Sequence, residues 1–128
     1  MLDGTLGAKR RTRNAMRFRW HQCVIADPLL TAAALRFAGL IMHRFRADLG
    51  YAAVSHRAAA KQLHMSERTM LRARDLLQER GWLYRMNGAP APGAPNTTAR
   101  YALTGGPDDL DLSAHADTGD ADTDDSTA

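Results

Sequence analysis

The sequence predicts a mainly α-helical protein with a small β-hairpin, an α+β fold built on a three-helix core. Two observations predict this fold class. Apolar residues recur at spacings of three and four over residues 31–50 and again over residues 55–81, as amphipathic helices require. Two short β-prone runs, residues 82–86 and 100–103, then flank a segment rich in proline and glycine, which is typical of a hairpin with a long loop.

The length and composition are those of a single soluble domain. The 128 residues suffice for one modest core. No apolar run approaches the roughly 20 residues that span a bilayer, and no apolar stretch follows the first basic cluster, so we expect neither a membrane segment nor a secretory signal. A single cysteine, Cys23, rules out an internal disulfide and suits a reducing cytoplasm.

Charge is divided unevenly along the chain. All 17 lysines and arginines lie between Lys9 and Arg100, whereas eight of the 14 acidic residues lie between Asp108 and Asp125. Residues 1–107 hold the 17 cations and six acids, a net charge of +11, and residues 108–128 carry −8. So basic a body favours a polyanionic partner, with nucleic acid ahead of an anionic membrane. The alternative is a soluble domain that is basic without such a partner.

Residues 1–19 are expected to form a flexible basic arm. The first eight residues have a disorder-prone composition, and six cations then fall within eleven positions. Such a run repels itself and stays extended unless an anion neutralises it. The cations are Lys9, Arg10, Arg11, Arg13, Arg17 and Arg19. The apolar residues Trp20, Val24 and Ile25 mark the start of the folded domain, which is expected to span residues 20–104.

The first helix is expected to begin after Thr31, whose hydroxyl can accept a hydrogen bond from a free backbone N–H. Its apolar stripe consists of Leu35, Ala38, Met42, Phe45 and Leu49. Gly50 fits the C-terminal cap. Leu40 and Ile41 fall outside the stripe, which leaves them for a homodimer interface or for packing under the N-terminal segment.

Two shorter helices follow a β-tolerant connector at residues 51–54. Ser55 is expected to cap a helix over residues 56–64, and Ser66 a helix that ends at Gly81, with Glu67 complementing the dipole of its first turn. The inward-facing residues of the two helices are Ala59, Ala60, Leu63, Met70, Ala73 and Leu77.

The hairpin and an acidic tail complete the chain. Residues 87–98 hold three prolines and two glycines and are expected to form the loop between strands 82–86 and 100–103. Residues 105–128 have almost nothing to bury and are expected to be disordered. Such a tail serves as a solvating segment or, more sharply, competes with DNA for the basic body.

Residues 55–83, SHRAAAKQLHMSERTMLRARDLLQERGWL, resemble the helix-turn-helix core of winged-helix bacterial DNA-binding proteins. Small residues on the second helix allow the third to cross it closely, and residues 64–66 make the tight turn between them. Gly81-Trp82-Leu83, a long loop and Tyr101-Ala102-Leu103 match the two strands of the wing. The resemblance covers residues 20–104 and is greatest to phage and plasmid replication-initiator-like proteins and related regulators.

The resemblance implies that the third helix reads duplex DNA. The N-terminal end of that helix enters the major groove, where an arginine can bridge O6 and N7 of guanine. Arg68 and Arg72 are four apart and share the outward face. The implied reading residues are Ser66, Glu67, Arg68, Thr69 and Arg72.

Other residues are implied to hold the DNA backbone, and each is weighed equally against a solvated surface residue. Arg57 and Lys61 lie on the second helix. The wing and its base contribute Arg85, Asn96, Thr97, Thr98 and Arg100. The arm contributes Lys9, Arg10, Arg11 and Arg13, which fit an adjacent minor groove.

The sequence therefore predicts a cytoplasmic, nucleoid-associated protein, bacterial and from a mobile element, that binds specific double-stranded DNA and regulates transcription by occupying its site. A replication initiator-like or accessory protein and a protein-interaction module are the alternatives. No phosphate-binding loop, nucleophile elbow, paired-carboxylate set or metal-ligand cluster is present in the sequence, so we expect no enzyme activity, cofactor, metal or small-molecule ligand. A homodimer would supply a larger footprint on a two-fold DNA site.

Overall fold

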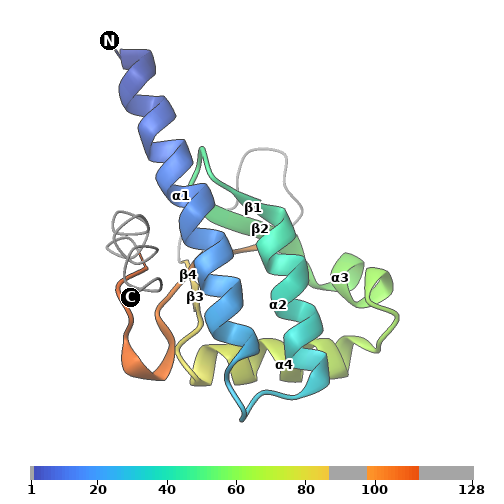
Figure 1. The fold of residues 1–128 in the computed structure, drawn as a ribbon. Coiled ribbons are helices and arrows are strands. Elements are labelled where there is room, and N and C mark those ends of the chain that lie inside the picture. Colours follow the sequence, from blue (N-terminus) through green and yellow to red (C-terminus); the bar gives the residue numbers. More distant parts are fainter. Residues whose placement is uncertain (1, 87–97, 113–128) are drawn as a thin grey trace.

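The computed structural model describes residues 2–86 and 98–112, with side chains from residue 8 onward. Figure 1 shows two long helices, α1 (Leu2–Ile25) and α2 (Ala32–Arg44), side by side in front of a small sheet, with α4 (Glu67–Glu79) crossing below them. The short helix α3 (His56–Gln62) precedes α4. The described part of the chain is thus mainly helical with one antiparallel sheet, an α+β architecture.

The sheet contains four strands, in the order β1-β2-β4-β3. Its strands are β1 (Phe45–Arg46), β2 (Tyr51–Ser55), β3 (Leu83–Arg85) and β4 (Thr98–Leu103). The expected hairpin is β3–β4, in which Leu83 faces Leu103. The connector expected at residues 51–54 is instead a strand that pairs with β4, so the expectation of a two-stranded hairpin alone is wrong. Ala52 and Val54 are buried alternately with their exposed or half-buried neighbours, as in a strand with one face on the core. The sequence did not predict this strand because alanine has a low β-propensity.

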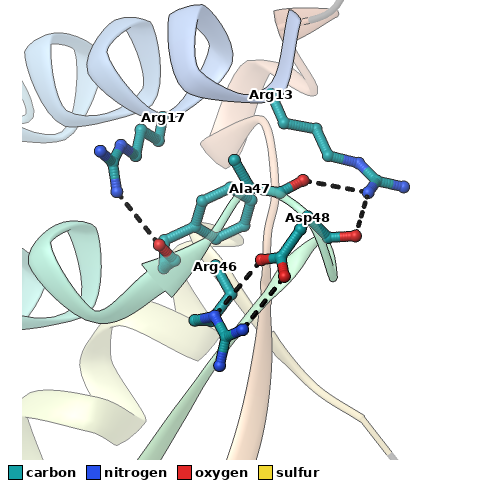
Figure 2. A network of polar contacts seen from close by, with 6 residues as sticks. Arg13, Arg17, Arg46, Ala47 and Asp48 are labelled. Atoms are coloured by element: carbon teal, nitrogen blue, oxygen red, sulfur yellow. Dashed lines mark hydrogen bonds and ion pairs between the residues drawn. The ribbon is translucent and has the colours of Figure 1, made fainter. Parts of the chain in front are cut away.

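The N-terminal segment is helical rather than extended, and it belongs to the core. Trp20 and Val24 are fully buried, and the Trp20 indole N–H donates a hydrogen bond of 2.8 Å to the carbonyl of Trp82, which precedes β3. Figure 2 shows how the charge of α1 is accommodated: Arg13 donates to the carbonyls of Ala47 and Asp48, both at 3.1 Å, and Arg17 reaches across from the same helix.

Arg17 donates to the carbonyl of Phe45 at 3.0 Å, just beyond the last turn of α2, where backbone carbonyls lack helical partners. The expectation of a flexible, extended arm over residues 9–19 is therefore wrong. The sequence predicted that an external anion would be needed to hold this segment in place. In the structure, backbone carbonyls of the β1–β2 region accept hydrogen bonds from Arg13 and Arg17 instead.

The N-cap of α2 was predicted correctly, and its buried face only in part. The Thr31 hydroxyl accepts a hydrogen bond of 3.1 Å from the backbone N–H of Ala34. The buried residues of the helix are Ala34, Phe37, Ala38, Leu40 and Ile41, of which only Ala38 belongs to the expected stripe. The helix ends at Arg44, so Phe45 lies in β1, Leu49 is exposed, and Gly50 serves the β1–β2 turn with a φ of +82°.

Leu40 and Ile41 are buried in the same core as Trp20 and Val24 of α1, so of the two alternatives left open for them, the homodimer interface is wrong and packing under the N-terminal segment is confirmed. Ile41 is inaccessible to solvent and Leu40 is only 7% exposed. Helix α2 has apolar residues on several sides, so its sequence is compatible with two different buried faces, the expected one and the one that is observed. The sequence cannot tell which stripe is buried without knowing that α1 covers one side of the helix.

The predictions for α3 and α4 are confirmed at their caps and inner faces. Ser55 and Ser66 cap the two helices through their hydroxyls. The turn between the helices places His64 in the left-handed region, with a φ of +56°. The buried side chains are Ala59, Ala60, Met70, Ala73 and Leu77, whereas Leu63 is half-buried.

The fold continues past β4 to Leu112. A 3-10 helix (Gly106–Asp108) follows β4, and Leu112 is only 5% exposed. Gly106 packs under the indole of Trp82, where a Cβ atom would lie 2.5 Å from the ring. The expected disorder from residue 105 onward is therefore wrong for residues 105–112, because two glycines and a buried leucine give this segment a surface to pack on. Residues 113–128 and most of the expected loop, residues 87–97, lie outside the described residues.

Candidate nucleic-acid interface

The exposed face of α4 has a sharp division of charge. Arg68 and Arg72 are exposed on the first two turns, while Asp75 and Glu79 are exposed on the same face toward the C-terminus. Cations near the N-terminus of a helix add to the positive end of its dipole. The first half of α4 therefore attracts a polyanion and the second half repels it.

The start of α4 is held by its own polar residues. The Ser66 hydroxyl accepts the backbone N–H of Thr69 and donates to the Thr69 hydroxyl, both at 3.0 Å. This arrangement fixes the first turn without using Arg68. Glu67 lies 4.0 Å from Arg57 of α3, and because both side chains are more than half exposed the ion pair adds little stability. Lys61 is exposed on the last turn of α3.

The N-terminal half of α4 borders a shallow hollow. Thr69 and Arg72 line it together with Thr31 and Ala33 from the start of α2, around a volume of about 340 Å³. Sequence reasoning did not place α2 beside this face. The packing of α2 across α4 is a tertiary feature that no local pattern signals.

A cluster of polar side chains lies between α3, α4 and the β3–β4 hairpin. The His56 ring nitrogen Nε2 lies 2.8 Å from the Tyr101 hydroxyl and 3.5 Å from the guanidinium of Arg74. Arg74 is only 16% exposed and forms an ion pair of 2.7 Å with Asp75. Burial, followed by the nearby charges of Arg74 and Arg85, lowers the pKa of His56. Neutral His56 is therefore the form that this environment favours.

The position of Arg74 in this cluster was not predicted from the sequence. It lies four residues after the buried Met70, on the side of α4 that faces the hairpin. The four-residue spacing from Met70 was the one sequence feature that could have indicated this position. An arginine at the margin of an apolar face, however, usually keeps its guanidinium in solvent.

The predicted contacts of the hairpin have separate environments. Arg85 is exposed on β3. Arg100 is half-buried on β4, with its guanidinium carbon 5.4 Å from the centre of the Tyr51 ring, a cation–π contact. Thr98 begins β4, and Thr97 and Asn96 lie outside the described residues.

The predicted arm residues are split by the helical structure of α1. Lys9, Arg10 and Arg11 are exposed, whereas Arg13 is held by the carbonyls described above. In Figure 1 the start of α1 lies at the far end of the molecule from α4. The structure therefore brings the α3 and α4 candidates together and places the cations of α1 on a separate surface.

Two other findings bear on the kind of site. Among the side chains that the structure describes, no group of three or more His, Cys, Asp and Glu residues could hold a metal ion. No helix in the described segments is long and apolar enough to cross a membrane.

No protein-family model matches the sequence, and neither a curated protein nor a solved structure matches it.

Proposed function

We propose that this chain binds specific double-stranded DNA through a winged helix-turn-helix domain. The element order α2-β2-α3-α4-β3-β4, with β4 between β2 and β3, supports that fold. The observation that carries the function is the exposed pair Arg68 and Arg72 on the first two turns of α4, beyond a capped tight turn. In helix-turn-helix proteins, the N-terminal end of the recognition helix is the end that contacts base edges.

The charge division on α4 sets how the helix would enter the major groove. Arg68 and Arg72 would approach guanine O6 and N7, while Asp75 and Glu79 would stay away from the phosphates. The helix would therefore enter end-on, with its first two turns in the groove. Thr69, beside Arg72 in the hollow against α2, could meet a thymine methyl group or a phosphate.

Backbone contacts would fix the register of the helix on the duplex. Lys61 and Arg85 are exposed on the flanking elements, and Arg57 can exchange its weak pair with Glu67 for a phosphate. Such contacts strengthen binding without reading sequence. We propose that the bound protein regulates transcription by occupying its site.

Selection of a binding site from random duplexes, followed by substitution, tests this function. Arg68→Ala and Arg72→Ala should each weaken binding to the selected site by about 1–3 kcal/mol, roughly 5- to 150-fold, and relax its specificity. Glu79→Ala, on the same exposed face, is the matched control and should not weaken binding. Failure to enrich any sequence, or parental affinity in both arginine variants, would contradict the proposal.

A further inference from the structure

Cations from the first half of α1 surround a hollow on the β1–β2 turn. This cationic hollow has a volume of about 160 Å³ and is lined by Lys9, Arg10, Arg13, Ala47 and Asp48. Figure 2 shows Arg13 beside the turn, with its guanidinium directed at the backbone of Ala47 and Asp48. Because a cleft lined by one sign of charge focuses the electrostatic field, these cations attract an anion more strongly than they would on a flat face.

Arg13 is fixed in the cationic hollow before any ligand arrives. Its Nη1 atom donates to the carbonyls of Ala47 and Asp48, both at 3.1 Å. Gly50, with a φ of +82°, leaves room for the guanidinium, since a Cβ atom there would lie 3.2 Å from the guanidinium carbon. In the described part of the chain both of these bonds use Nη1, so Nε and Nη2 are the atoms that can donate to an anion.

The carboxylate in the cationic hollow is already paired with another residue. Asp48 accepts two hydrogen bonds from Arg46, at 3.0 and 3.3 Å, and these, with the charge of Arg10 as a smaller cause, lower the pKa of Asp48. Arg46 does not line the hollow. The three cations that do line it therefore keep their positive charge unbalanced by Asp48, and a phosphate group would relieve their mutual repulsion.

We propose that the cationic hollow binds backbone phosphates of duplex DNA, on a stretch that flanks the one that α4 would read. The choice of DNA as the polyanion rests on the proposed function. Arginine and lysine are common partners of phosphate oxygens, and such contacts carry no sequence information. The hollow would therefore add affinity without adding specificity.

The length of α2 sets the distance between the two contact regions. Thr31 and Ala33, at the start of α2, lie beside Thr69 and Arg72 of α4. The end of α2 leads directly into β1 and the turn that forms the cationic hollow. The 13 residues of the helix span about 20 Å, which equals about six base pairs of duplex. On a duplex that runs along α2, the hollow would meet phosphates about six base pairs from the bases that α4 reads.

The surroundings of the cationic hollow favour a duplex over an anionic membrane. A helix that lies on a membrane inserts large apolar side chains beside its cations. Among the exposed large apolar residues of the described segments, only Leu49 lies on the β1–β2 turn, while Phe18 and Ile25 lie on the second half of α1. The hollow therefore has too small an apolar border to insert into lipid.

Binding of the full-length protein to a nonspecific duplex tests the cationic hollow without relying on α4. Lys9→Ala with Arg10→Ala should weaken binding roughly tenfold at about 0.1 M salt and lower the salt slope by about 1 to 2, because each phosphate contact contributes about 0.9. Arg11→Ala with Arg44→Ala is the matched control and should change both quantities much less. It removes the same charge from exposed positions that do not line the hollow. Circular dichroism checks that the variants fold.

Hydroxyl-radical footprinting on a selected site with long flanks locates the contact. The parent should protect the backbone about six base pairs beyond the read segment on one side. Lys9→Ala with Arg10→Ala should lose that flanking protection and keep protection of the site itself. The loss of nonspecific affinity should persist when Arg68 and Arg72 are both replaced by alanine, so failure of the hollow and failure of the proposed function are distinguishable.

Three results would overturn the proposal. An equal fall in salt slope for the hollow variant and its control would indicate a general effect of charge. Flanking protection that survives Lys9→Ala with Arg10→Ala would show that other residues hold those phosphates. Binding to vesicles of phosphatidylglycerol and phosphatidylcholine that depends on Lys9 and Arg10, with duplex affinity unchanged, would assign the hollow to a membrane.

Discussion

At the scale of single residues, Asp27 ties three segments together. Its carboxylate, 2% exposed, accepts two hydrogen bonds of 3.0 Å from Arg80 and one of 2.8 Å from the indole of Trp82. A further bond of 3.0 Å comes from the backbone N–H of Leu29. These bonds, led by that from Arg80, lower the pKa of Asp27 to about 2. The α1–α2 turn, the end of α4 and the start of the hairpin are thereby joined.

We predict that Asp27→Asn destabilises the fold by about 2–3 kcal/mol at pH 7, since Arg80 and Trp82 lose a charged acceptor. The folded-state pKa of Asp27, about 2, lies below its ordinary 3.8, so the stabilisation is complete above roughly pH 5 and disappears as the pH falls toward 2. Urea unfolding of parent and variant from pH 7 to pH 3 measures this. A stability difference that stays constant over that range would contradict the assignment.

His56 is a base where Asp27 is an acid, but the pKa of each is lowered in the folded state, so both make the protein less stable as the pH falls. Because its pKa is lowered in the folded state, the fold favours neutral His56, and this stabilisation is present above the ordinary pKa of 6.5 and lost as the pH falls through the folded pKa. We predict that His56→Gln removes part of the stability loss that the parent shows between pH 7 and pH 5. Thermal unfolding over that range tests it, with His43→Gln, an exposed site, as control.

At the scale of elements, local patterns predicted some helices and not others. The α3–α4 pair was predictable because Ser55, Ser66 and the small inward-facing residues all act within the pair itself. Helix α1 was not, since its cations oppose helix formation unless the carbonyls of a segment some 30 residues later are in place. Strand β2 likewise depends on β4, about 45 positions away in the paired register.

The candidate site was also predictable only where its residues follow from the spacing within one helix. Outward residues such as Arg68 and Arg72 follow from helical spacing. The placement of Arg74 against His56 and of Thr31 beside Arg72 follows from the packing of separate elements, which spacing does not encode.

Replacing the two anchoring arginines should loosen α1. We predict that Arg13→Ala with Arg17→Ala lowers the free energy of unfolding by about 1–3 kcal/mol, because each guanidinium donates hydrogen bonds to backbone carbonyls of the β1–β2 region. Hydrogen exchange of residues 9–19 should quicken. Arg10→Ala with Arg11→Ala, both exposed, removes the same charge and is the control. Equal exchange in the two double variants would show that the carbonyl contacts do not hold α1.

At the scale of the whole molecule, the division between basic body and acidic end does not coincide with the boundary of the fold. Asp108 and Asp109 belong to the described segment that packs on Trp82, and Leu112 is buried. A truncation after residue 107 would remove charge and core together. A truncation after residue 112 removes five aspartates, changing the formal charge from +3 to +8, and leaves Leu112 in place.

This second truncation separates the two roles considered for the tail. If residues 113–128 compete with DNA for the cations of the body, the chain ending at residue 112 should bind nonspecific duplex more tightly, with a steeper loss of affinity as salt rises, because more phosphates can be neutralised. Fluorescence polarisation from about 50 to 200 mM salt measures both quantities. A tail replaced by uncharged residues of equal length controls for bulk. Unchanged affinity and salt slope would leave the tail with a solvating role only.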